Sequence, residues 1–202
     1  MNNRIAKFLT AAALMVASPV YGGVKEGDVN IGVTAGGQLR GIYFGGPVEL
    51  PEINGPLFGW GDIDPGFFTI ENPIPSEGLF VPEEGANIVL EVIAFDAALK
   101  GWTPGFASIF DDPAEMWNIG AVPFDEHAFW HIDSNDPGFV PPPTQTEWNA
   151  TFRLLDTGST GYLPSDPVTL TFTPVPEPAS LVLLALGGVL IARRGRRRSP
   201  AS

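Results

Sequence analysis

Glycine and proline interrupt nearly every window of residues 24–173 that is long enough to form a helix. The chain contains 24 glycines and 21 prolines among its 202 residues. Proline removes a backbone donor and glycine costs conformational entropy, so both break helices and favour turns. Apolar residues nevertheless make up 44% of the chain, enough to form a core. The sequence therefore predicts a folded, turn-rich domain built from short strands.

Three segments alternate apolar and polar residues at a period of two, which is typical of strands buried on one face. They are residues 28–34, 147–155 and 168–173. A fourth segment, residues 88–95, is a nearly continuous apolar run rich in β-branched side chains, which indicates a central strand. We expect an all-β fold, an antiparallel β-sandwich of the Ig-like or jelly-roll kind.

The first residues have the order of a secretory signal peptide. Arg4 and Lys7 precede an apolar run over residues 8–17, and small residues continue to Gly22. A positive segment, an apolar segment and small residues around the cleavage position define such a peptide. The apolar run is shorter than the roughly 20 residues that cross a bilayer, which disfavours an uncleaved anchor. We predict a signal peptide over residues 1–22.

Three features follow one another near the other end of the chain. The Pro176-Glu177-Pro178 motif favours an extended backbone, and an apolar run over residues 181–192 follows it. The run predicts a transmembrane helix, separate from the β domain. A basic cluster then acts as a stop that keeps the end of the tail cytoplasmic. Its members are Arg193, Arg194, Arg196, Arg197 and Arg198.

This combination resembles the PEP-CTERM sorting signal of Gram-negative bacteria. The resemblance implies that exosortase, a membrane protease, recognises Pro176, Glu177 and Pro178 and processes the tail during export. It also implies a place in the cell envelope or extracellular matrix, including biofilm, with a transient membrane anchor. A plain C-terminal anchor is the alternative. The expected organisation is a signal peptide (1–22), an exported β-sandwich domain (23–173) and a sorting signal (174–202).

The charge of the exported part limits its partners. Between residues 24 and 176, 22 acidic residues against 4 basic ones give a net charge of about −18. Such a charge repels phosphate backbones, so we expect no nucleic-acid binding. It is compatible with divalent cations and with neutral or cationic partners. The chain has no cysteine, so stability must come from apolar burial or bound ions.

The string Asp156-Thr157-Gly158-Ser159 resembles the catalytic loop of aspartic proteases. Those enzymes need two such aspartates at close range to share a proton. The sequence has no second Asp-Thr-Gly string, and about 20 residues separate Asp156 from the sorting motif. We interpret the string as a turn between the strands at 147–155 and 168–173, and we predict no catalytic residue and no enzymatic activity.

Both histidines fall in a segment with strand periodicity, where polar residues alternate with apolar ones. The polar members are Asp125, His127, His131 and Asp133. A strand would put the histidines about 13 Å apart, too far to share one metal ion. Asp125 with His127, or His131 with Asp133, are possible co-ligand pairs, but no third ligand is identifiable. We expect solvent-facing histidines rather than a transition-metal site.

Two loops and several aromatic residues are further candidates for ligand binding. Residues 62–66 and 133–138 are oxygen-rich turns of the kind that calcium prefers, although neither has the spacing of a helix-loop-helix site. We expect ordinary Asp/Gly turns and no cofactor, with calcium in these loops as the alternative. Tryptophans on a β face can stack against sugars. Trp130 and Trp148 are expected in the core, and the exposed candidates are Trp60, Trp102 and Trp117.

The sequence thus favours a non-enzymatic exported protein with a structural or adhesive role. Its expected partners are exosortase during processing, the membrane before processing and, as the resemblance implies, exopolysaccharide. The alternatives are a carbohydrate- or calcium-binding module and, less favoured, a secreted hydrolase.

Overall fold

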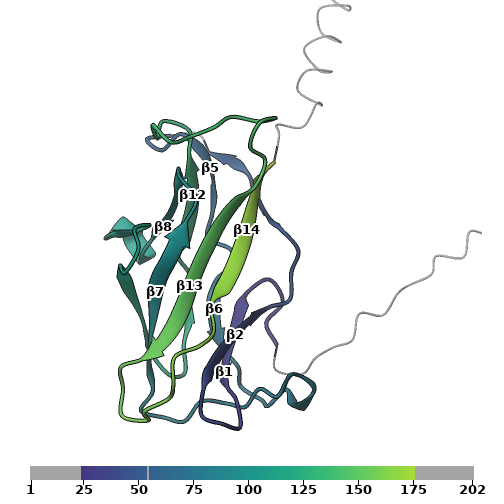
Figure 1. Cartoon of the computed structure of the whole chain (residues 1–202), viewed down its shortest axis with the longest axis vertical. Helices are drawn as coiled ribbons and strands as arrows, with labels where there is room; N and C mark the ends of the chain where they lie inside the picture. The colour runs from purple at the N-terminus through teal and green to yellow at the C-terminus, as the bar shows by residue number, and fades with distance from the viewer. Residues whose placement is uncertain (1–23, 54, 176–202) are drawn as a thin grey trace, which may run out of the picture.

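The computed structural model describes residues 24–53 and 55–175, which form short strands joined by turns and two 3-10 helices (Figure 1). The strands are β1 (Val29–Val33), β2 (Leu39–Tyr43), β3 (Val48–Leu50), β4 (Glu52–Ile53), β5 (Gly59–Asp62), β6 (Phe67–Thr69), β7 (Asn87–Phe95), β8 (Leu99–Trp102), β9 (Ile109–Phe110), β10 (Met116–Ala121), β11 (Asp125–Glu126), β12 (Phe129–Asp133), β13 (Trp148–Asp156) and β14 (Val168–Pro174). The 3-10 helices are η1 (Pro75–Glu77) and η2 (Pro104–Phe106). The expected all-β class is confirmed.

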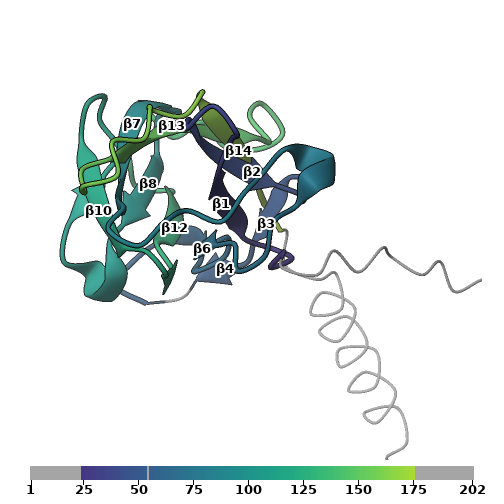
Figure 2. The ribbon, with the colours of Figure 1, turned by 90° about the horizontal axis from the view of Figure 1, so that it is seen from below.

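The strands form three sheets around a shared core. One five-stranded sheet has the order β10-β7-β13-β14-β3, a second has the order β4-β5-β12-β8-β9, and a four-stranded sheet has the order β11-β6-β1-β2. Figure 2 shows β7, β13 and β14 on one side of the molecule and β6 and β12 on the other. One cluster of buried apolar side chains contains residues from all three sheets.

Two strand pairs depart from the expected antiparallel arrangement. β1 pairs with β6 in parallel, and β14 pairs with β3 in parallel, whereas the other strand pairs described are antiparallel. A two-residue hairpin can join only antiparallel strands, but the strands of these two pairs are not consecutive in the chain. No tight turn therefore forces them to run in opposite directions.

The two longest strands have the places that the sequence predicts. β7 lies between β10 and β13, so the apolar run is a central strand. β13 pairs with β14 in antiparallel register, with Trp148 opposite Phe172 and Ala150 opposite Leu170. All four of these side chains are buried, which confirms the alternation in both segments.

β1 is buried along its whole length, whereas the sequence predicts burial on one face. A second small core covers it, made of Ile70, Ile74 and Leu79 from the segment around η1. A Cβ at Gly32 would lie 2.5 Å from Leu79 Cγ, so glycine allows this segment to pack directly against the strand. The polar Asn30 is satisfied in the interior because its amide donates to the backbone oxygens of Lys25 and Asp28.

Trp130 on β12 lies at the centre of the aromatic core. Its side chain is fully buried, and its indole N–H donates to the Pro65 carbonyl oxygen over 2.8 Å. Other aromatic rings surround it at centroid distances between 5.0 and 6.2 Å. These rings belong to Phe67, Phe95, Phe110 and Phe172. They come from strands or strand ends in all three sheets, so Trp130 links the sheets to one another.

Candidate functional sites

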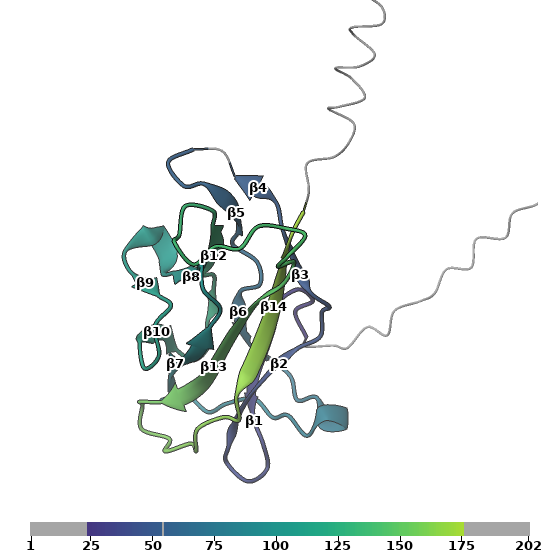
Figure 3. The ribbon, with the colours of Figure 1, turned by 45° about the horizontal axis from the view of Figure 1, so that its top comes forward.

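The described part of the chain ends immediately before the predicted sorting motif. β14 ends at Pro174, and the Val175 N–H donates to the Leu50 carbonyl oxygen over 2.8 Å. Figure 3 shows this end of β14 beside β3. The motif residues (Pro176, Glu177, Pro178) and the basic stop (Arg193, Arg194, Arg196, Arg197, Arg198) lie outside the described residues, as does the predicted signal peptide. Among the described residues, no helix is long and apolar enough to cross a membrane.

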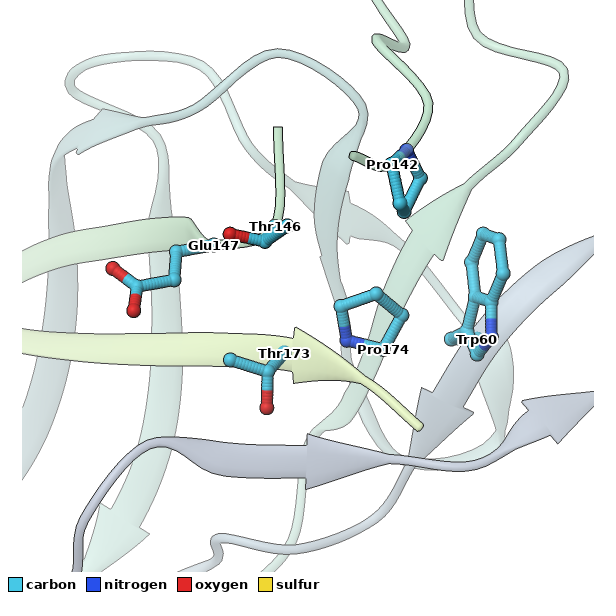
Figure 4. A pocket seen from close by; sticks show the side chains of 6 residues that line it. All are labelled: Trp60, Pro142, Thr146, Glu147, Thr173 and Pro174. Carbon is cyan, nitrogen blue, oxygen red and sulfur yellow. The ribbon is translucent and has the colours of Figure 1, made fainter. Parts of the chain in front are cut away.

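A pocket of about 360 Å³ opens beside the end of β14. Figure 4 shows the rings of Trp60, Pro142 and Pro174 gathered at one side of it. Thr146, Glu147 and Thr173 complete its lining. The pocket therefore has an aromatic and proline wall next to hydroxyl and carboxylate groups.

The ring of Trp60 is held by a stack of aromatic side chains behind it. Its centroid lies 5.9 Å from that of Phe139, and Phe139 in turn stacks on the buried Trp148 at 5.9 Å with an interplanar angle of 7°. Trp60 is the partly exposed end of this stack. The Trp60 indole N–H has no hydrogen-bond partner in the part of the chain that the structure describes, so stacking fixes the ring at the pocket wall.

Of the other tryptophans, three are buried in the core and one is partly exposed. Trp130 and Trp148 are buried as predicted, and Trp102 is partly exposed. Trp117, predicted as an exposed candidate, is instead buried at 6% exposure. Its ring stacks on Phe110 at 5.4 Å and meets the edge of Phe67 at 5.5 Å, because β10 packs its tryptophan into the aromatic core.

A second candidate site lies where the chain enters β1. The Lys25 ammonium lies 2.8 Å from Asp28 Oδ2, 2.6 Å from Asp125 Oδ1 and 3.4 Å from His127 Nε2. The other ring nitrogen of His127 lies 3.2 Å from Asp64 Oδ1. Burial acts to lower the pKa of Lys25, but hydrogen bonds to Asp125 and Asp28 outweigh it, so the pKa is raised.

This cluster joins residues that the sequence placed in separate candidate sites. Asp125 and His127 were a co-ligand pair without a third ligand, and Asp64 belonged to an oxygen-rich turn. In the structure, ligand atoms of Asp28, Asp64 and His127 all lie within 4.8 Å of one another. Sequence reasoning missed Asp28, although an aspartate directly before an apolar strand was the available signal.

His131 contradicts the expectation of solvent-facing histidines. It is 1% exposed, and its Nε2 lies 3.0 Å from the Phe58 carbonyl oxygen. Burial is the main cause that lowers the pKa of His131. β12 is the middle strand of its sheet. Neighbouring loops cover its outer face, where the ring centroids of Phe106 and Phe129 lie 5.1 Å apart. The alternation correctly predicted that Trp130 and Ile132 face the core. His131 is buried as well, because the opposite face of β12 is also covered.

The second oxygen-rich turn uses its carboxylates within the fold. Asp136 accepts hydrogen bonds from Lys100 over 2.9 Å and from the Gly138 N–H over 2.8 Å. The Lys100 hydrogen bond is the main cause that lowers the pKa of Asp136. Asp133 Oδ1 accepts the Asn135 N–H over 2.9 Å. These carboxylates are hydrogen-bonded in the manner of an Asx turn and a lysine ion pair.

Asp156 ends β13, and the predicted turn to β14 is present. Its carboxylate accepts hydrogen bonds from three groups within this turn and from the first residue of β7. They are the N–H groups of Asn87 (3.0 Å), Gly158 (2.8 Å) and Tyr162 (3.2 Å) and the Thr160 hydroxyl (2.5 Å). Burial acts to raise the pKa of Asp156, but these bonds outweigh it and lower the pKa.

Comparison with known proteins identifies the end of the chain. Residues 174–198 match the family description "PEP-CTERM protein-sorting motif". No curated protein and no solved structure shows a significant match to the chain. The described part of the chain is thus an all-β domain, and a PEP-CTERM protein-sorting motif begins where it ends. The motif indicates export, sorting to the envelope and processing by exosortase.

Proposed function

We propose that the chain is a non-enzymatic surface or extracellular-matrix protein whose β-sandwich domain has a structural or adhesive role. The observation that supports this most directly is the join between the domain and the sorting motif. The match begins at Pro174, which is also the last residue of β14. The folded domain is therefore attached to the sorting signal without a linker, so processing would deliver the domain itself to the envelope.

Replacing Glu177 by alanine should block removal of the basic tail, because the motif is what exosortase is expected to recognise. We expect the wild-type protein to lose the mass of its arginine-rich tail in its own host. Glu177→Ala, and the wild type in an exosortase-deficient strain, should keep that mass and stay in the membrane fraction. Intact mass spectrometry with fractionation measures both effects.

Glu84→Ala is a matched control, since Glu84 is an exposed glutamate in a loop far along the chain from the motif. It should be processed like the wild type. If the wild type in its own host also keeps the full-length tail, like Glu177→Ala and the wild type in the exosortase-deficient strain, the C-terminal segment is a simple membrane anchor and not a processed sorting signal.

A second candidate function is carbohydrate binding at the pocket beside β14. The observation that favours it is the partly exposed Trp60 ring, held in place by stacking and lying beside hydroxyl groups. Sugar rings combine apolar faces with hydroxyl edges and suit such a surface. The strongly acidic exported part makes neutral or cationic sugars the better ligands.

Trp60→Ala should weaken binding to a neutral polysaccharide about tenfold, which corresponds to about 1.4 kcal/mol. Affinity electrophoresis through gels that contain soluble neutral glucans or galactans measures the change. Trp102→Ala is the control, since Trp102 is also partly exposed but does not line the pocket. Equal retardation of Trp60→Ala and wild type, or no retardation of the wild type, argues against this function.

A further inference from the structure

The cluster around Lys25 contains the donor atoms of a metal site together with a positive charge supplied by the protein. Three potential ligand atoms surround the Lys25 ammonium, at 2.8 Å (Asp28), 2.6 Å (Asp125) and 3.4 Å (His127). They come from the start of β1 and from β11 and the residue that follows it. These segments lie about 100 residues apart in the chain, and the fold brings them to one point.

Asp28 shows that this position is built for a cation. Its side chain is only 3% exposed, and the Gly66 N–H donates to Oδ1 over 2.8 Å. Within the described part of the chain, the partner of Oδ2 is the Lys25 ammonium at 2.8 Å, and no other group donates to this oxygen. A buried carboxylate is strongly destabilising unless a positive group compensates it. The site therefore needs a cation at this oxygen.

His127 is held in place by contacts on both edges of its ring. A Cβ at Gly66 would lie 2.6 Å from the imidazole, so the ring packs directly on the glycine backbone. Its Nδ1 lies 3.2 Å from both the Ile63 carbonyl oxygen and Asp64 Oδ1. These contacts orient Nε2 toward Lys25 and Asp125.

The donor set and its spacing fit a transition metal. Asp28, Asp64 and His127 each offer an atom, and these atoms lie within 4.8 Å of one another. Ligand atoms that are each about 2.0–2.2 Å from a zinc ion lie somewhat closer to one another than 4.8 Å. Small side-chain rotations would therefore bring these three atoms to bonding distance from one ion. One imidazole with carboxylates suits zinc and similar ions better than calcium, which prefers oxygen ligands alone.

We propose that Asp28, Asp64 and His127 form a binding site for a divalent transition metal ion of the zinc class, with Lys25 as its internal competitor. The ammonium and the metal exclude each other because both would be positive charges at the same carboxylate. Displacement requires movement of the lysine side chain only. The backbone of Lys25 is tied to Asn30, whose Oδ1 accepts its N–H and whose Nδ2 donates to its carbonyl oxygen.

The test is a calorimetric titration of the whole protein, purified from its host, with zinc ions alone. Removal of the competing charge by Lys25→Ala should tighten zinc binding at least tenfold relative to the wild type. His127→Ala in the Lys25→Ala background should abolish this binding. His127 is partly exposed, so this substitution is compatible with folding, and circular dichroism checks it. Calcium at the same concentration should not compete with zinc.

Lys100→Ala is the matched control, because Lys100 also lies between two carboxylates, at 3.2 Å from Asp111 and 2.9 Å from Asp136. His131 lies opposite Lys100 on the neighbouring strand, but its Nε2 contacts the Phe58 carbonyl oxygen. Lys100 and its two carboxylates lie outside the group of close ligand atoms formed by Asp28, Asp64 and His127, so removal of Lys100 should leave zinc affinity unchanged. The proposal is overturned if Lys25→Ala binds zinc no more tightly than the wild type, or if the double variant binds as tightly as Lys25→Ala. Equal competition by calcium would overturn the assignment to the zinc class.

Discussion

Truncating Trp130 to alanine should destabilise the domain by about 3–5 kcal/mol, the range typical of large aromatic side chains in cores. The substitution removes a fully buried ring that contacts four other aromatic rings, and it leaves the Pro65 carbonyl oxygen without its indole donor. For a domain of this size, each kcal/mol lowers the melting temperature by about 2–4 °C. Urea unfolding followed by tryptophan fluorescence measures the loss.

Trp102→Ala provides the comparison, since Trp102 is partly exposed and, among the described residues, its ring has one aromatic ring as a close neighbour, that of Phe106 at a centroid distance of 5.8 Å. It should cost clearly less than Trp130→Ala. Equal losses for the two variants would mean that Trp130 is not the link between the sheets. If Trp130→Ala does not fold at all, Trp130→Phe retains most of the ring volume and allows the loss of the hydrogen bond to be measured separately.

Asp156→Asn should destabilise the domain by about 1–3 kcal/mol at pH 7, because a charged acceptor of several hydrogen bonds is replaced by a neutral one. The folded state lowers the pKa of Asp156, so its ionised form is favoured by folding. That contribution is complete at pH values above the unfolded pKa of about 3.9 and is lost as the pH falls through the lower folded value. The difference in stability between wild type and Asp156→Asn should therefore shrink between about pH 5 and the acid limit of folding.

Urea unfolding at a series of pH values checks this expectation. Asp166→Asn is the control, because Asp166 is an exposed aspartate near β14 whose carboxylate accepts one longer bond, from Gln38 over 3.3 Å. It should change stability by less than about 0.5 kcal/mol at any pH. A loss for Asp156→Asn that stays constant with pH would show that shape, and not charge, determines the role of this side chain.

Local patterns in the sequence predicted the strands whose environment is set by neighbouring residues. The alternation in 147–155 and 168–173 and the apolar run in 88–95 correspond to β13, β14 and β7. The pairing of β14 with β3 was not predictable in this way, because it joins segments more than 100 residues apart. The burial of both faces of β1 and β12 also depends on distant loops, and for this reason His131 was misplaced.

In the candidate sites, too, contacts between neighbouring residues were predictable and contacts between distant segments were not. The sequence identified Asp125 and His127 as neighbours, and they lie 3.4 Å apart. It could not supply Asp28 and Asp64 as further members, since their proximity follows from the parallel pairing of β1 with β6 and the antiparallel pairing of β6 with β11. The pocket at Trp60 combines side chains from loops and strands that only the folded sheets bring together.

The position of β14 inside its sheet determines how the domain bears load while it is still joined to its sorting signal. β14 is flanked by β13 on one side and β3 on the other, with the β3 pairing concentrated at the last residues before the motif. A pull along the tail is directed along this strand, so it loads the hydrogen bonds of both neighbours together in shear. An edge strand would instead be peeled away one hydrogen bond at a time. Tension on a tethered domain is thereby spread across the sheet.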